Sequence, residues 1–130
     1  MNNSTITDQN ADTELNKDGV IIAVQSGTTG ETYVQENYPK ATVQAYGNST
    51  DAFAAMQSGQ ANAVCTNKAV VEAMLADAYK DAKIVKAIAT GEEYAIVVSK
   101  DNPALTTAIN TALDKLTKDG TIEALINQYM

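Results

Sequence analysis

The sequence predicts an α/β fold, in which a three-layer α/β/α, doubly wound lobe with a mainly parallel five-stranded sheet is followed by two C-terminal helices. Two observations lead to this prediction. Short apolar runs rich in β-branched residues alternate along the chain with segments whose apolar residues recur at helical spacing. Such alternation favours a parallel sheet with helices on both faces, since right-handed crossovers place each helix against the sheet.

Composition divides the chain into three ranges. Residues 1–17 are polar, rich in Asn, Thr and Asp, and without periodicity, so we expect a flexible N-terminal tail. Residues 18–98 carry the alternating strands and helices and are expected to form the α/β lobe. Residues 99–130 are the expected C-terminal helical segment, because their apolar residues recur at helical spacing.

Each expected element follows from a local pattern. Short apolar or alternating runs predict strands over residues 20–24, 41–46, 61–65, 84–88 and 94–98. Apolar residues at helical spacing predict helices over residues 30–37, 50–58, 68–79, 103–118 and 122–129. The second of these helices is expected to be capped by Ser49 or Thr50, whose hydroxyl oxygens can accept hydrogen bonds from free backbone N–H groups.

Prolines, glycines and one asparagine mark the ends of the expected helices. Pro39 ends the first helix, because the residue before a proline avoids helical angles. Gly59 ends the second, as the residue that takes the left-handed conformation after a helix. Asn102 and Pro103 begin the long C-terminal helix as its cap and its first residue, and Gly120 interrupts it.

The first expected strand runs directly into a loop of small residues, and this loop is the candidate functional feature of the chain. Its members are Ser26, Gly27, Thr28, Thr29 and Gly30. A helix that starts here leaves its first backbone N–H groups without partners, at the positive end of the helix dipole, so the loop stabilises an anion. The alternative is a plain strand-to-helix turn that binds nothing.

Composition excludes several classes of function. The 130 residues include sixteen acidic side chains and nine basic ones, all lysines, for a formal net charge of −7. This balance argues against a nucleic-acid partner, since a phosphate backbone would not be neutralised. With no histidine and one cysteine, Ser-His triads, His-based metal sites and internal disulfides are excluded, and we expect no cofactor. Cys65, in a small apolar strand, is expected to be an inert core residue.

Five segments in order carry a resemblance to a known family. They are residues 23–31 (AVQSGTTGE), 46–59, 63–67 (AVCTN), 92–98 (EEYAIVV) and 119–122 (DGTI). Together they resemble the extracellular solute-binding proteins, family 3, of polar amino-acid ABC importers, which have the type II periplasmic-binding-protein fold. The resemblance covers residues 18–130 and indicates the second lobe of such a protein with its C-terminal helices.

The resemblance implies a non-enzymatic clamp, in which two α/β lobes close on a free amino acid and present it to an ABC permease. Thr28 and Thr29 match the positions that hold the ligand's α-carboxylate, and Gly27 and Gly30 match those that permit close backbone approach. The family location is extracellular or periplasmic, in some cases with a lipoprotein tether. No secretory signal precedes the matching residues in this sequence.

Two departures from the family pattern weaken the expected site. Asn67 stands where the family carries an Asp that holds the ligand's α-ammonium, and a neutral amide offers a hydrogen bond without a countercharge. Asn67 is equally well explained as a helix N-cap. The first lobe, which supplies an Arg and aromatic side chains, is not in this sequence. We therefore expect the isolated lobe to bind amino acids weakly or not at all.

The C-terminal helices carry an apolar stripe that needs a partner. It comprises Leu105, Ile109, Leu113, Leu116, Ile122, Leu125 and Ile126. Because an apolar patch of this size is rarely left in water, we expect a homodimer formed through these helices, by exchange of the C-terminal segment.

Rival functions remain open at this point. Residues 26–32 also resemble the phosphate loop of flavodoxin-like proteins, which would indicate a phosphate or flavin site, although the chain has no Trp and one Phe to stack a flavin ring. A sensory domain of a receptor, or an enzyme on the same fold such as a dehydratase, are the further alternatives. The identity of the bound amino acid does not follow from the sequence.

Overall fold

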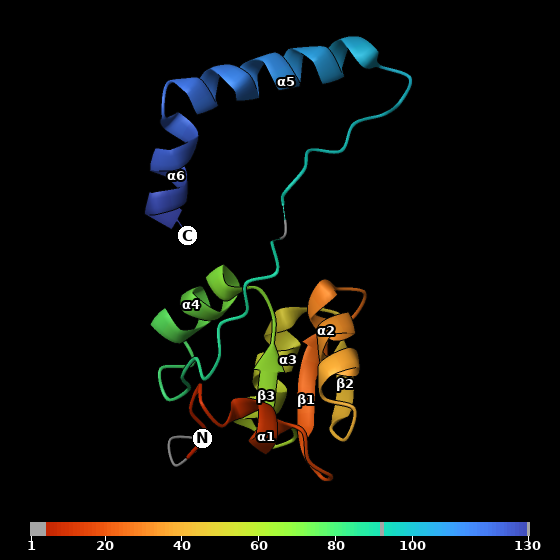
Figure 1. Ribbon diagram of the computed structural model, residues 1–130, viewed down its shortest axis with the longest axis vertical. Coiled ribbons are helices and arrows are strands. Elements are labelled where there is room, and N and C mark those ends of the chain that lie inside the picture. Colours follow the sequence, from red (N-terminus) through yellow and green to blue (C-terminus); the bar gives the residue numbers. More distant parts are fainter. Residues whose placement is uncertain (1–4, 92, 130) are drawn as a thin grey trace. The chain divides into compact units, whose positions relative to one another are not determined.

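A computed structural model describes residues 5–91 and 93–129 (Figure 1). The elements, in chain order, are α1 (Ala11–Leu15), β1 (Ile21–Gln25), α2 (Thr29–Asn37), β2 (Thr42–Tyr46), α3 (Ser49–Gln57), β3 (Ala63–Cys65), α4 (Lys68–Ala76), α5 (Pro103–Lys118) and α6 (Thr121–Tyr129). The chain divides into two compact units, unit 1 over Met1–Ile88 and unit 2 over Ala89–Met130. The unit boundary therefore lies ten residues before the expected boundary, at residue 88 and not at residue 98.

The sheet of unit 1 is parallel, with β1 between β2 and β3. Ile21 pairs with Thr42 and Gln25 with Tyr46, while Ile22 pairs with Ala63 on the other side of β1. Helices connect consecutive strands, because parallel strands need a long crossover connection, usually a helix. The predicted α/β class with a parallel sheet is confirmed.

The predicted number of strands was wrong. Among the described residues the sheet has three strands, not five, and residues 84–88 and 94–98 form no ladder. An apolar alternation marks a half-buried extended segment, but a strand also needs a neighbour for its backbone hydrogen bonds. Ile96 and Val97 remain 61% and 92% exposed, so these two side chains lack an apolar cover within the described chain.

The expected flexible tail is also not what the structure shows over residues 5–17. Residues 11–15 form helix α1, and both Ala11 and Leu15 are buried. These two residues are four apart, so they lie on the same helix face and pack into the core of unit 1. Residues 1–4 of the expected tail lie outside the described residues. A single short apolar pair among polar neighbours is too weak a periodic signal to predict such a helix.

The core has two halves, one on each face of β1. On one face the buried residues are Ala11, Leu15, Ile22, Val24, Val34 and Tyr38. On the other face they are Ala23, Ala52, Phe53, Ala55, Met56 and Ala61. Successive residues of β1 contribute to opposite halves because strand side chains alternate between faces. Unit 1 therefore has the predicted three layers, with α1 and α2 on one face of the sheet and α3 on the other.

Unit 2 consists of an extended segment and the two predicted helices. The side-chain oxygen of Asn102 accepts a hydrogen bond from the N–H of Leu105 at 3.1 Å, and Pro103 is the first helical residue, as predicted. Gly120 takes a φ of +80°, which separates α5 from α6. No described helix in either unit combines the length and the apolar character that a membrane crossing requires.

Phe53→Ala is expected to reduce the free energy of unfolding by about 3–5 kcal/mol, the usual range for truncating a buried phenylalanine. Phe53 is 2% exposed, and its ring centroid lies 5.1 Å from that of Tyr79. Urea unfolding followed by circular dichroism measures the change. Gln57→Ala, at an exposed position of the same helix, is the control. Equal stability of the two variants would contradict the proposed core.

Candidate functional site

Three loops meet the carboxyl edge of the sheet, and each leads into a helix. Because β1, β2 and β3 are parallel, their carboxyl ends lie at one edge, where open α/β sheets bind ligands. The helices that follow are capped by the side chains of Thr28, Asn48 and Asn67. The cap of α3 is thus Asn48, not Ser49 or Thr50, because the helix begins one residue earlier than its apolar pattern indicates.

Hydrogen bonds hold the loop between β1 and α2 at both of its ends. The N–H of Ser26 donates to the carbonyl oxygen of Tyr46 at 2.8 Å, which fixes the loop beside β2. The hydroxyl of Thr28 donates to the carbonyl oxygen of Gln25 at 2.7 Å and accepts from the N–H of Glu31 at 3.3 Å. Gly27 takes a φ of +73°, a conformation that side chains other than glycine rarely adopt. The predicted strand–loop–helix unit is therefore present.

Backbone donors remain available at this loop. The N–H of Gly27 donates to Glu31 Oε2 at 2.7 Å, so one donor is already used by an acidic side chain of α2. Within the described chain, the N–H groups of Thr28, Thr29 and Gly30 have no protein acceptor. They lie at the positive end of the α2 dipole. The loop can thus accept an anion through three adjacent N–H groups.

Gly30 connects this loop to the end of β3. A Cβ atom at Gly30 would lie 3.4 Å from the carbonyl oxygen of Cys65 and 3.6 Å from its Sγ, so the backbone at Gly30 lies against the end of β3. Cys65 itself is partly buried, and desolvation raises the pKa of its thiol. A raised pKa disfavours the reactive thiolate, in keeping with the inert role predicted for this residue.

Asn67 lies at the start of α4, directly after β3. Its Oδ1 accepts a hydrogen bond from the N–H of Ala69 at 2.9 Å, so the N-cap role is present in the structure. The side chain is exposed at the same sheet edge as the Ser26–Gly30 loop. A role in holding a ligand stays a prediction, and the amide has no charge to offer an ammonium group.

A side-chain network that the sequence did not predict links the three loops. Ser49 Oγ donates to Gln25 Oε1 at 2.9 Å and lies 3.2 Å from Thr66 Oγ1. These residues are 24 and 17 positions apart, so no local pattern brings them together. A signal was nevertheless present, because all three lie at or just after the end of an expected strand. Among the described residues, no group of three or more metal-binding side chains occurs.

Comparison with known proteins now identifies the family. A model of the bacterial extracellular solute-binding proteins, family 3, matches residues 12–130. The chain belongs to this family. Among similar curated members, the ABC transporter glutamine-binding protein GlnH of Bacillus subtilis (strain 168) is 33% identical over 116 residues, which are 89% of this chain and 42% of GlnH. The predicted resemblance to amino-acid solute-binding proteins is confirmed.

Two further members of similar sequence or structure support the assignment. A putative ABC transporter arginine-binding protein 2 of Escherichia coli (strain K12) is 32% identical, over 85% of this chain and 47% of its own length. A solved structure of an ancestral arginine-binding protein bound to glutamine has a TM-score of 0.81 and 32% identity, and the match covers 98% of this chain and 55% of that one. The chain thus spans about half the length of the solute-binding proteins it matches.

Thr28→Ala is expected to lower the free energy of unfolding by about 1 kcal/mol, the typical cost of losing a helix N-cap. The variant removes both the acceptor for the N–H of Glu31 and the donor to the carbonyl of Gln25. Thermal or urea unfolding provides the measurement, with Thr28→Ser as the control that keeps the hydroxyl. A Ser variant as destabilised as the Ala variant would show that the hydroxyl does not hold the loop.

Proposed function

We propose that this chain is the ligand-binding second lobe, with the C-terminal helices, of an amino-acid ABC importer's solute-binding protein, and that it is non-enzymatic. The single observation that carries the proposal is the set of three N–H groups at residues 28–30, which have no acceptor in the described part of the chain and lie at the carboxyl edge of a parallel sheet. Three adjacent hydrogen-bond donors suit the α-carboxylate that every free amino acid carries. Named relatives of the chain bind glutamine or arginine.

The carboxylate would be held by backbone groups with one hydroxyl beside them. Hydrogen bonds from N–H groups to a carboxylate are charge-assisted, and therefore stronger than neutral ones. The hydroxyl of Thr28 already donates to the carbonyl of Gln25, so its part is to shape the loop. Thr29 is exposed, and within the described chain its hydroxyl has no hydrogen-bond partner, which makes it the hydroxyl best placed to meet the ligand. Gly27 and Gly30 would permit close backbone approach, and Ser26 completes the binding loop.

Asn67 would meet the ammonium side of the ligand with a neutral amide. Its Oδ1 already accepts a hydrogen bond from the N–H of Ala69. It would therefore bind an ammonium group more weakly than a carboxylate without such a partner. Half of the clamp is contributed by the other lobe, which is the missing partner in this proposal. Both considerations point to weak binding of a polar amino acid by the isolated chain. The site indicates the class of ligand, a free amino acid, and not which amino acid is bound.

The remaining partners follow from the family. In the full-length protein, closure of the two lobes would trap the amino acid and present it to an ABC permease in the membrane. The described family is extracellular, and we place this protein outside the cytoplasmic membrane or in the periplasm, with a lipoprotein tether as one form of attachment. A flavin or phosphate site receives no support from the relatives named above.

Titration of the ¹⁵N-labelled chain with glycine, glutamine and arginine tests the proposed site. We expect amide shifts confined to residues 26–30 and 67, in fast exchange and at millimolar ligand, because half of the contacts are absent. Thr29→Val is expected to weaken these shifts, whereas Thr32→Val, one turn along the same helix, leaves them unchanged. Shifts spread over unit 2 would count against the site. Micromolar binding by calorimetry would contradict the half-clamp.

Unit 2 supports a second proposal, a homodimer formed through α5 and α6 by exchange of the C-terminal segment. None of the α5 side chains is buried, and Leu105, Leu125 and Ile126 are each 44–49% exposed. Apolar side chains at helical spacing with this exposure favour an interface.

Light scattering at high protein concentration is expected to give twice the mass of the monomer. Ile126→Glu is expected to return the protein to a monomer by burying a charge in the interface, while Gln128→Glu, an exposed position of the same helix, leaves the dimer intact. A wild-type chain that remains monomeric at every concentration would rule out the dimer.

A further inference from the structure

The last part of unit 1 is a strap without regular secondary structure. Residues 77–88, called the strap here, follow α4 and lead to unit 2. The ring of Tyr79 packs against Phe53, and Val85 packs against the half of the core that contains Val34. Two backbone hydrogen bonds also hold the first part of the strap, from the N–H of Tyr79 to the carbonyl oxygen of Met74 and from the N–H of Ala82 to that of Tyr79.

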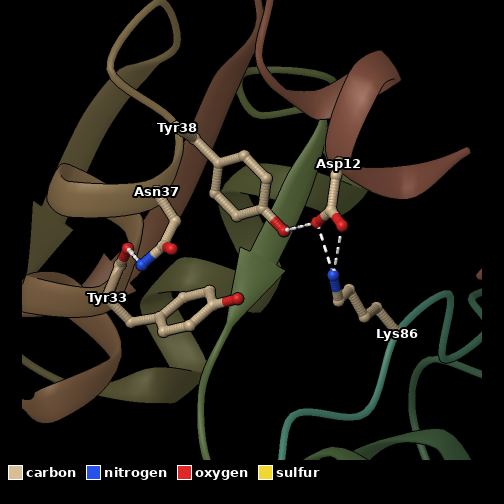
Figure 2. A network of polar contacts seen from close by, with 5 residues as sticks. All are labelled: Asp12, Tyr33, Asn37, Tyr38 and Lys86. Carbon is tan, nitrogen blue, oxygen red and sulfur yellow. Dashed lines mark hydrogen bonds and ion pairs between the residues drawn. The ribbon is translucent and has the colours of Figure 1, made fainter.

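One polar cluster holds the end of this strap (Figure 2). The ammonium group of Lys86 contacts both carboxylate oxygens of Asp12, on helix α1. The hydroxyl of Tyr38 donates to Asp12 Oδ1 at 2.8 Å. The ring of Tyr38 meets that of Tyr33 edge to face at 6.1 Å, and the side-chain amide of Asn37 donates to the carbonyl of Tyr33. The carboxylate of Asp12 is therefore held from two sides.

This ion pair differs from the others recorded in the described chain. Lys17 with Glu14, and Lys68 with Glu72, join residues three and four apart on exposed helical surfaces, where ion pairs contribute little. Asp12 and Lys86 are 74 residues apart. The Lys86 side chain is 23% exposed and the Asp12 side chain 64%, while the Tyr38 residue that shares Asp12 is 4% exposed. A long-range, bidentate contact anchored on a buried tyrosine can therefore order a segment that the local pairs cannot.

We propose that Asp12, Tyr38 and Lys86 form an ionic clasp that fastens the end of the strap to helix α1, and that this clasp sets the point at which the chain leaves unit 1 for unit 2. With the clasp closed, residues 84–88 are part of unit 1. With it open, they become part of the connection between the units. The clasp depends neither on the family nor on the carboxylate loop, so its test is independent of the proposed function.

The clasp responds to pH through its own groups. Hydrogen bonds from Lys86 and Tyr38 lower the pKa of Asp12, and the hydrogen bond with Asp12 raises the pKa of Lys86. Because the pKa of Asp12 is lower in the folded chain, its contribution is lost as pH falls through that lowered value. The contribution of Lys86 is lost only as pH rises through its raised pKa. The other titratable groups that act on Lys86 are Tyr33 and Asp8.

Backbone ¹⁵N relaxation of the full chain tests the clasp. Order parameters of residues 84–88 are expected to fall from about 0.85 to below about 0.6 in Lys86→Gln and in Asp12→Asn. The Asp12 variant acts across 74 residues, so a change in the strap on mutation of α1 is the decisive result. Lys80→Gln removes the same charge from an exposed position of the strap and is expected to leave the order parameters unchanged.

Salt and acid extend the test without mutation. High salt is expected to loosen residues 84–88 in the wild type, since a partly exposed ion pair is screened, and acid pH is expected to do so by protonating Asp12. Neither condition should loosen the strap further in Asp12→Asn. The double variant Asp12→Asn with Lys86→Gln should be no more mobile than either single variant. A strap that stays ordered in both single variants, or loosens equally in Lys80→Gln, overturns the clasp.

Discussion

The pairing of β1 with strands on both sides is the constraint on which the rest of unit 1 depends. It buries Ile22, Ala23 and Val24 completely or nearly so, and it sets β2 and β3 parallel to each other. Parallel neighbours need crossover helices, which then cover both faces of the sheet. The same geometry places the carboxyl ends of all three strands at one edge. The site is thus a consequence of the core, and not an addition to it.

In the proposed function, backbone groups in place of basic side chains would bind an anion at that edge. The sequence has no arginine, and its net charge is −7, so the attraction must be local. Glu31 and Thr28 secure the loop, which leaves the N–H groups of Thr28, Thr29 and Gly30 directed to a ligand in the proposal. The hydrogen bond from Gly27 to Glu31 also means that one loop donor is shared with an acid of the protein itself. In the proposal, the loop selects an α-carboxylate and still binds it weakly.

The parts of the structure that the sequence predicted are those with local chemical causes. The β-branched run before Ser26, the left-handed Gly59, and the Asn102-Pro103 start of α5 were all predictable, because each depends on its immediate neighbours. Strand pairing of residues 84–88 and 94–98 was not, because it depends on a distant partner. The contacts of Ser49 with Gln25 and of Asp12 with Lys86 likewise arise only when separate elements pack together. Helix α1 was missed because one buried pair, Ala11 and Leu15, gives too short a pattern.

The central claim is that the loop binds the carboxylate of an amino acid. The most direct test offers the carboxylate and the ammonium group to the protein on two separate small ions. Amide spectra of the chain would be recorded with sodium acetate and, separately, with methylammonium chloride, at matched ionic strength. The account predicts that acetate moves the amides of Thr28, Thr29 and Gly30, and that methylammonium leaves them in place. A loop that responds to methylammonium and not to acetate, or to neither ion, would contradict it.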